Sequence, residues 1–175
     1  GRHAFQKRLQ SLGLKLSREQ VNSAFERFKV LCDKKKEVFD DDLLTIVDEE
    51  ILAVPEVYTL EYINTNSGSR TIPTATVILK KGQENLQDSS TGDGPVDASL
   101  KALDRITGVP GRLTSYSIRA VTSGKDALGE AKIKVTFGDD EVSAKAASTD
   151  VIEASVRAYV SAINRVLALR DRRKK

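Results

Sequence analysis

Residues 67–102, SGSRTIPTATVILKKGQENLQDSSTGDGPVDASLKA, decide the fold, because residues 123–158, SGKDALGEAKIKVTFGDDEVSAKAASTDVIEASVRA, repeat their pattern at a gapless shift of 56 positions. The shift aligns identical residues: Ser67 with Ser123, Gly68 with Gly124, Ala75 with Ala131, Gly82 with Gly138, Ala98 with Ala154, Ser99 with Ser155, and Ala102 with Ala158. It also aligns apolar positions, among them Val57 with Leu113, Leu60 with Tyr116, and Val77 with Ile133. Identities at turns and at a helix start indicate an internal duplication, because backbone geometry constrains the residue type there.

Each copy has the pattern of three strands followed by a helix. Two runs with a period of two, 58–63 and 76–80, are each followed by a turn, and a third short strand surrounds Leu86. In the first run, Tyr58, Leu60 and Tyr62 alternate with Thr59, Glu61 and Ile63. One helix face then carries Val96, Leu100, Leu103 and Ile106. The expected fold class is α+β, with two pseudo-twofold βββα units, 55–110 and 111–170, built from two antiparallel sheets and two helices.

Residues 1–53 have a helical period instead, which predicts a small helical linker subdomain before a second domain, 54–175. Phe5, Leu9 and Leu12 share one face of a short helix that Gly13 ends. Ser17 and Gln20 have the spacing of a capping box at the start of a second helix, whose apolar face includes Cys32. We therefore expect Cys32 in the core. A third helix begins at Asp40 or Asp41, and Pro55 closes the segment.

The composition excludes several classes of chemistry. The single histidine, His3, and the single cysteine, Cys32, form no metal-binding or nucleophile–base spacing, so we expect no catalytic or metal site. Charges nearly cancel to +3, and part of the excess lies in the basic tail 170–175. That tail is typical of a solvated helix end, although a nucleic-acid contact is the alternative. No apolar run is long enough for a membrane span, and a lone cysteine favours a reducing cytoplasm.

The segment 92–95, Gly-Asp-Gly-Pro, is the candidate ligand-binding loop. It places two glycines before a helix with proline in the first turn, which leaves backbone N–H groups at the helix start for an anion such as a carboxylate. The same pattern also occurs in ordinary loops. At the matching place the second copy has Ser148, Thr149 and Asp150, a helix cap. The copies therefore differ where a ligand would bind.

The second helix has more apolar surface than one three-stranded sheet needs. This face consists of Ile152, Val156, Tyr159, Val160, Ile163, Val166 and Leu167. The surplus predicts a protein partner, most simply a second copy in a symmetric homodimer. Coverage of this face by the N-terminal helices is the alternative.

Three stretches resemble one known family, the C-terminal regulatory domain of α-isopropylmalate synthase and its relative citramalate synthase. They are 92–98 (GDGPVDA), 124–129 (GKDALG) and 148–155 (STDVIEAS). Residues 1–4, the stretch from Phe28 to Lys36 and 41–43 resemble the helical linker that follows the catalytic barrel in these enzymes. The resemblance covers nearly the whole chain in order.

The resemblance implies a parent enzyme, an acyltransferase that condenses acetyl-CoA with pyruvate or 2-oxoisovalerate in a TIM barrel with a divalent metal. Because the barrel is absent, we expect no turnover from this chain and no cofactor bound to it. His3 lies in the linker motif, near an active site in the intact dimer or simply at a helix start. The implied partners are a second copy, the catalytic barrel of the same protein and a small-molecule effector, with no nucleic acid and no membrane.

The family's regulatory domain binds the end product of its pathway near a dimer interface. The effector would be isoleucine for a citramalate synthase, our preferred expectation, or leucine for an α-isopropylmalate synthase, and a purely structural dimerisation module is the third possibility. The resemblance implies an effector site made of Gly92, Asp93, Gly94, Pro95, Val96, Asp97, Leu113, Tyr116 and Ala120. Amides near Gly92 and Gly94 would hold the carboxylate, and Asp93 or Asp97 the ammonium. Tyr116 is equally compatible with an ordinary strand-face aromatic.

Overall fold

The computed structural model describes residues 1–14, 16–34, 37–51, 55–121 and 127–174. The chain divides into two compact units, Gly1–Ala53 and Val54–Lys175, and each is described by itself. Ser123 and Gly124, which the repeat aligns with Ser67 and Gly68, lie outside the described residues. Lys35 and Lys36 of the linker motif also lie outside them.

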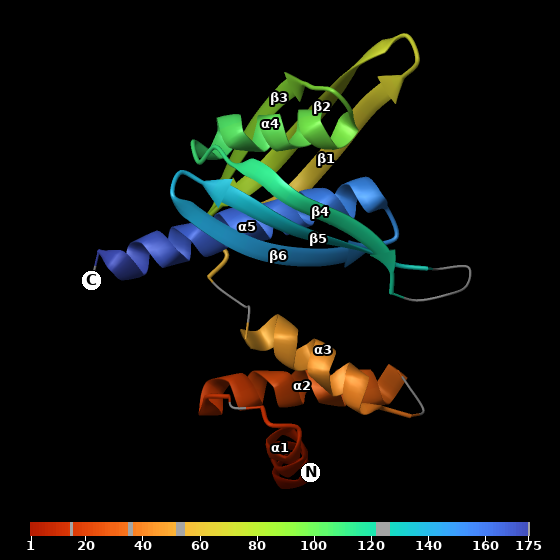
Figure 1. The fold of residues 1–175 in the computed structure, drawn as a ribbon, viewed down its shortest axis with the longest axis vertical. Helices are drawn as coiled ribbons and strands as arrows, with labels where there is room; N and C mark the ends of the chain where they lie inside the picture. The colour runs from red at the N-terminus through yellow and green to blue at the C-terminus, as the bar shows by residue number, and fades with distance from the viewer. Residues whose placement is uncertain (15, 35–36, 52–54, 122–126, 175) are drawn as a thin grey trace. The chain divides into compact units, whose positions relative to one another are not determined.

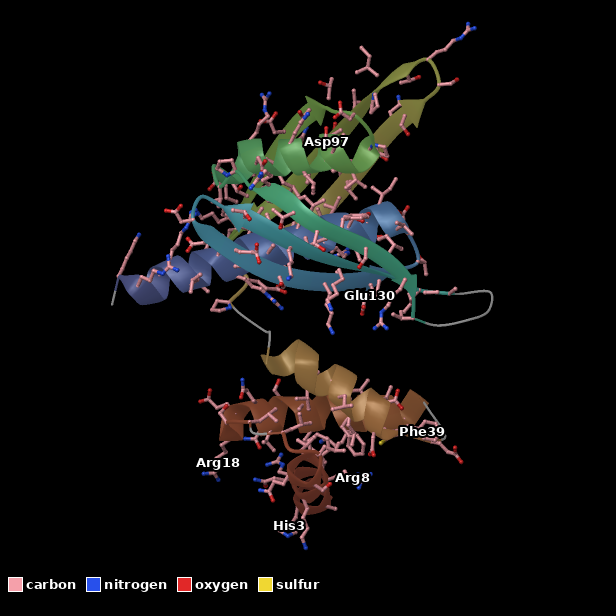
Figure 2. All side chains as sticks on the ribbon, viewed as in Figure 1. His3, Arg8, Arg18, Phe39, Asp97 and Glu130 are labelled. Atoms are coloured by element: carbon pink, nitrogen blue, oxygen red, sulfur yellow. The ribbon has the colours of Figure 1, made fainter. Side chains whose placement is uncertain are left out.

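The first unit is a helical subdomain made of α1 (Arg2–Ser11), α2 (Arg18–Lys34) and α3 (Asp40–Ile51), as Figure 1 shows. Phe5 and Leu9 of α1 are buried, and the Phe5 ring packs against the ring of Phe28, with centroids 4.9 Å apart. Arg8 forms an ion pair with Asp40 at the start of α3; Figure 2 labels Arg8 on α1. The apolar face predicted for the first helix is therefore confirmed.

The predicted helix start at Ser17 and helix end at Gly13 are confirmed, but the prediction that Cys32 is buried is wrong. The amide of Ser17 donates to Gln20 Oε1 (2.9 Å) while the amide of Gln20 donates to Ser17 Oγ (3.2 Å), which is the predicted capping box. Gly13 has a left-handed φ of 78° after α1, where it ends the helix. Cys32 is exposed rather than buried, because the packed face of α2 passes through Val21 and Ala24 instead.

The second unit contains two successive copies of a βββα arrangement, so the predicted fold class is confirmed. The first copy comprises β1 (Thr59–Gly68), β2 (Thr71–Lys81), β3 (Glu84–Thr91) and α4 (Pro95–Thr107). The second comprises β4 (Arg112–Ala120), β5 (Gly129–Phe137), β6 (Asp140–Ser148) and α5 (Val151–Arg173). Each set of strands forms its own antiparallel sheet, in the order β1-β2-β3 or β4-β5-β6.

The pairing registers confirm the 56-residue shift for the second and third strands of each copy. Val77 pairs with Asp88, and Ile133 pairs with Ala144 in the matching positions. Both hairpins turn at a glycine with positive φ, Gly82 at 62° and Gly138 at 61°. A left-handed residue is needed at this point of a tight turn, which explains why glycine stands there in both copies.

The shift is wrong for the first strand of each copy. Leu60 pairs with Leu79 whereas Leu113 pairs with Val135, so Leu60 corresponds to Leu113 and not to Tyr116. Tyr116, which pairs with Ile133, corresponds instead to Ile63. The chain from Leu113 to its partner Val135 is three residues longer than the chain from Leu60 to its partner Leu79, and a gapless comparison cannot accommodate this insertion.

A β-bulge also changes the alternation expected in β1. The register shifts between Leu60 and Tyr62, so the strand gains one residue there. Tyr62 is consequently 46% exposed, while Ile63 packs against the core. The expectation that Tyr58, Leu60 and Tyr62 lie on one face is therefore wrong at Tyr62. β4 carries the equivalent bulge between Leu113 and Ser115.

Each helix packs mainly on the second and third strands of its own copy, α4 on β2 and β3 and α5 on β5 and β6, as Figure 1 shows. The two helices also contact each other, and α5 contacts β1 of the first copy. The long apolar face of α5 is therefore covered within the unit: Val156, Ile163 and Val166 are fully buried. The argument from this face for a protein partner is wrong, and the N-terminal helices are not needed to cover it.

Two polar contacts join the copies inside this shared core. Asn164 of α5 accepts a hydrogen bond from the amide of Tyr58 (3.0 Å) and donates to the Tyr58 carbonyl (2.9 Å), just before β1. The hydroxyl of Tyr159 on α5 donates to Asp104 Oδ1 on α4 at 2.6 Å. Because buried polar groups must be hydrogen-bonded, these contacts fix how the two copies meet.

Candidate functional site

A pocket with a volume of about 570 Å³ lies between α4 of the first copy and β4 of the second. Its lining residues are Val96, Asp97, Leu100, Lys101, Asp104, Gly111, Arg112, Leu113 and Tyr116. The size is within the range of small-molecule sites, and the mixture of branched aliphatic and charged side chains suits a small amphiphilic ligand. Val96, Leu100 and Asp104 follow one another at four-residue intervals and therefore line the pocket along one helix face.

The start of α4 leaves backbone N–H groups available, two of them on the lining residues Val96 and Asp97. Gly94 occupies the N-cap position and provides no side-chain cap. Among the described residues, none accepts a hydrogen bond from the amides of Gly94, Val96 or Asp97. Pro95 has no N–H and stands in the first turn, where none is needed. Unpaired amides and the helix dipole together favour an anion at this point.

Gly92 has a steric role rather than the donor role predicted for it. Its amide donates to the Pro73 carbonyl at 3.0 Å and is therefore not available to a ligand. A Cβ at this position would lie 2.6 Å from Asp97 Oδ2 and closer still to the amide of Ala98. Only glycine allows the loop to pass this close to the first turn of α4.

Asp97 is held as a carboxylate by its neighbours. Asp97 Oδ2 accepts a hydrogen bond from the amide of Asp93 (2.8 Å) and lies 2.9 Å from Lys101 Nζ. These contacts, the Asp93 amide first, lower the pKa of Asp97 below its ordinary value. Figure 2 labels Asp97 on α4. Part of the acceptor capacity of Asp97 is thus already used within the protein.

The other end of the pocket is polar and belongs to the junction of the two copies. Asp104 accepts from the Tyr159 hydroxyl, and burial raises its pKa above the ordinary value, partly offset by that bond and by the Gly111 amide. A Cβ on Gly111 would come within 2.6 Å of the Tyr159 hydroxyl and of the Phe137 ring. Glycine at 111 therefore allows β4 to begin against this wall.

Tyr116 contributes a partly exposed aromatic wall. Its side chain is 41% exposed, and its hydroxyl is in hydrogen-bond contact with Ser155 Oγ at the start of α5. Leu113, on the far side of the bulge, is half-buried and packs against the main core. The tyrosine is thus held at its hydroxyl, and its side chain lines the pocket.

Four of the predicted site residues, Val96, Asp97, Leu113 and Tyr116, line this pocket. The others, Gly92, Asp93, Gly94, Pro95 and Ala120, are not among its lining residues. Sequence reasoning missed Leu100, Lys101, Asp104, Gly111 and Arg112. Leu100 and Asp104 could have been predicted from the sequence, because they continue the helical period that begins at Val96.

The described residues also include those considered for other kinds of site. Within the described residues, no group of three or more His, Cys, Asp or Glu side chains could hold a metal ion. His3 is exposed on α1, where Figure 2 labels it. No helix in the described part of the chain combines the length and the apolar character that crossing a membrane requires. Arg170 and Arg173 of the basic tail both pair with Asp140, which favours a structural role for these two cations.

Comparison with known proteins gives a consistent match. Residues 37–167 match the family model of the LeuA allosteric (dimerisation) domain. Relatives named 2-isopropylmalate synthase include proteins from Pelotomaculum thermopropionicum (51% identical over 168 residues), Carboxydothermus hydrogenoformans (54% over 168) and Microcystis aeruginosa (48% over 177). These matches cover 95%, 95% and 99% of this chain but 33% of each relative, so the chain spans about a third of their length. The chain belongs to the LeuA allosteric (dimerisation) domain family.

Proposed function

We propose that this chain is the leucine-sensing, dimer-forming regulatory region of a 2-isopropylmalate synthase. The observation that carries the proposal is the pocket between α4 and β4, where unpaired amides adjoin branched aliphatic side chains. The family description names both allostery and dimerisation, and the relatives bear the name 2-isopropylmalate synthase. That name favours leucine, our alternative at the outset, over the preferred expectation of isoleucine and citramalate synthase.

The polar groups of the pocket match the two charges of a free amino acid. The amides of Gly94, Val96 and Asp97 would receive the effector's carboxylate at the positive end of the α4 dipole. Asp97 and Asp104 are the carboxylates available for its ammonium. A zwitterion would thus be oriented along the helix.

The branched side chain of leucine would contact Val96, Leu100 and Leu113. Burying such a side chain contributes about 2–3 kcal/mol, whereas micromolar binding requires about 8 kcal/mol. The charged ends must therefore provide most of the affinity. Shape discrimination between leucine and isoleucine is limited to about 1–3 kcal/mol in an apolar pocket.

The parent protein would be an acyltransferase that joins acetyl-CoA to 2-oxoisovalerate with the help of a divalent metal. The described residues provide no ligand cluster for such a metal, so the metal and the reacting groups would belong to the rest of the enzyme. The role of this chain is then to bind the end product and the partner subunit, and to pass the binding event to that catalytic part.

A purely structural dimerisation module is the second candidate, and the exposed apolar surface favours it. Tyr116, Ile118 and Val121 on or beside β4, and Val151 at the start of α5, are all at least 36% exposed. Tyr116 and Ile118 point to the same face of the sheet because they are two residues apart on one strand. A second copy covering this strip would bury apolar area without any small molecule.

Calorimetry of the 175-residue chain with leucine, isoleucine, valine and alanine separates the two candidates. We expect leucine to bind most tightly and alanine least. Leu113→Ala should weaken leucine binding about tenfold, because it removes part of the apolar wall. Leu60→Ala is the matched control, since Leu60 holds the equivalent register position outside this pocket. No heat from any of the four, with a persistent dimer in sedimentation, would establish the structural module instead.

A further inference from the structure

The duplication produces two equivalent pockets, and only one of them has the open helix start. The second pocket, of about 360 Å³, lies between α5 and β1. Its lining residues are Leu60, Glu61, Tyr62, Ile63, Thr65, Asp150, Ile152, Glu153 and Arg157. Each pocket therefore combines the first turns of one copy's helix with the first strand of the other copy.

Five residues of each lining have a counterpart in the other. On the helices, Ile152, Glu153 and Arg157 stand where the first pocket has Val96, Asp97 and Lys101. On the strands, Leu60 and Ile63 hold the register positions of Leu113 and Tyr116. The acid–base pair four residues apart is repeated as well: Lys101 Nζ lies 2.9 Å from Asp97, and an Arg157 guanidinium nitrogen lies 2.8 Å from Glu153.

The decisive difference is at the N-cap. Both caps accept the first helical bond in the same way, from the Ala98 amide to the Gly94 carbonyl and from the Ala154 amide to the Asp150 carbonyl, each at 2.9 Å. The side chain of Asp150 also accepts a hydrogen bond from the amide of Glu153, at 3.0 Å. The equivalent amide, that of Asp97, has no acceptor among the described residues.

The fold does not require glycine at position 94. Gly94 has φ −167° and ψ 178°, an extended conformation open to any residue, and no atom lies within 4 Å of where its Cβ would stand. An aspartate cap there would satisfy an otherwise unpaired amide and stabilise α4. The backbone therefore does not account for the missing side chain at position 94, in contrast to the crowded Gly92.

We propose that Asp150 is the specificity-determining residue that closes the second pocket to the effector, so that one chain binds one amino acid. Its carboxylate accepts the hydrogen bond of the Glu153 amide, which a ligand carboxylate would need. It also repels a second anion at the same helix start. This inference rests on the proposed function. It predicts that the second pocket, which keeps aliphatic lining residues and the acid–base pair, gains binding when the cap is removed.

Equilibrium dialysis with labelled leucine tests this through stoichiometry. We expect one leucine per wild-type chain and two per chain for Asp150→Gly, the added site being weaker by about 10–200-fold because its pocket is smaller and lined differently. Asp150→Ala also removes the cap and serves if the glycine variant does not fold. Leu60→Ala in the Asp150→Gly background should abolish the added site, whereas Leu113→Ala should weaken the original one.

Asp150→Asn is the matched control at the same position. Asparagine caps a helix about as well as aspartate, so this variant should still bind one leucine. A second site in Asp150→Asn would overturn the proposal that the occupied amide closes the pocket. So would two sites in the wild type, or a single site in both Asp150→Gly and Asp150→Ala. No binding by the wild-type chain would instead overturn the proposed function, and this inference with it.

Discussion

The two βββα copies share their strand registers but differ at both ends of their helices. α4 begins at an uncapped glycine and ends after 13 residues, with Gly108 in the left-handed conformation at 67°. α5 begins at a capping aspartate and continues for 23 residues. The extra turns carry Asn164 to the start of β1. The difference indicates a division of roles: the second helix joins the copies, and the start of the first faces a candidate ligand site.

The strongest test of this division is Asn164→Leu. Asn164 occupies the position of Gly108 in the first copy, and it satisfies both backbone polar groups of Tyr58. Leucine would leave a buried N–H and a buried C=O unpaired at about 1–3 kcal/mol each, partly offset by its apolar surface. We expect a loss of about 2–5 kcal/mol in the free energy of unfolding, measured with urea.

Asn64→Leu is the control for this change, because Asn64 is exposed on β1. Its effect should stay within about 0.5 kcal/mol. Equal unfolding midpoints for Asn164→Leu and the wild type would contradict the role assigned to the long helix.

Tyr159→Phe should have the next largest effect. Tyr159 stands where the first copy has Leu103; both are buried, but only the tyrosine donates to Asp104 across the junction. Loss of a hydrogen bond to a charged group costs about 1.5–3 kcal/mol. Because burial already raises the pKa of Asp104, removing the hydroxyl should raise it further.

This change has a defined pH dependence. A carboxyl with a raised pKa contributes stability that is present below the unfolded-state pKa and lost as pH rises through the folded-state pKa. The deficit of Tyr159→Phe should therefore be larger at pH 7 than at pH 4, as urea midpoints at the two values would show. A deficit independent of pH would mean that the hydroxyl acts through packing alone.

Much of the fold follows from sequence periodicity and the internal repeat. The strands, the helices and the capping box at Ser17 rest on local patterns, which a sequence displays directly. The bulge after Leu60 was missed because Leu60, Tyr62 and Ile63 are all apolar, so the pattern does not reveal where the alternation changes phase. The wrong partner for Leu60 has the same origin: an insertion between β4 and β5 leaves helices aligned and first strands misaligned.

The candidate site was predictable on its helix and poorly predictable on its strand. Val96 and Asp97 follow the glycine loop directly, and any ligand at the helix start must lie near them. Asp104 bonds to Tyr159 and Gly111 lies against Phe137 and Tyr159, contacts with the second copy that no local pattern encodes. Their roles depend on Tyr159, which lies 55 positions from Asp104.

The smallest effect concerns the far end of α5, where the copies differ again. Asp140 pairs with Arg170 (3.2 Å) and Arg173 (2.7 Å), and these guanidinium groups lower its pKa. Glu84, at the matching position of β3, has no ion pair among the described residues, since α4 ends long before it could reach there.

A carboxyl with a lowered pKa contributes stability that is present above the unfolded-state pKa and lost as pH falls through the folded-state pKa. Asp140→Asn should therefore lower the urea midpoint at pH 7 and match the wild type near pH 2, whereas Glu84→Gln should match it at both. An equal loss in urea midpoint at pH 7 for Glu84→Gln and Asp140→Asn would show that the extra turns of α5 have no electrostatic role. The contrast between the helices would then rest on Asn164 and Tyr159 alone.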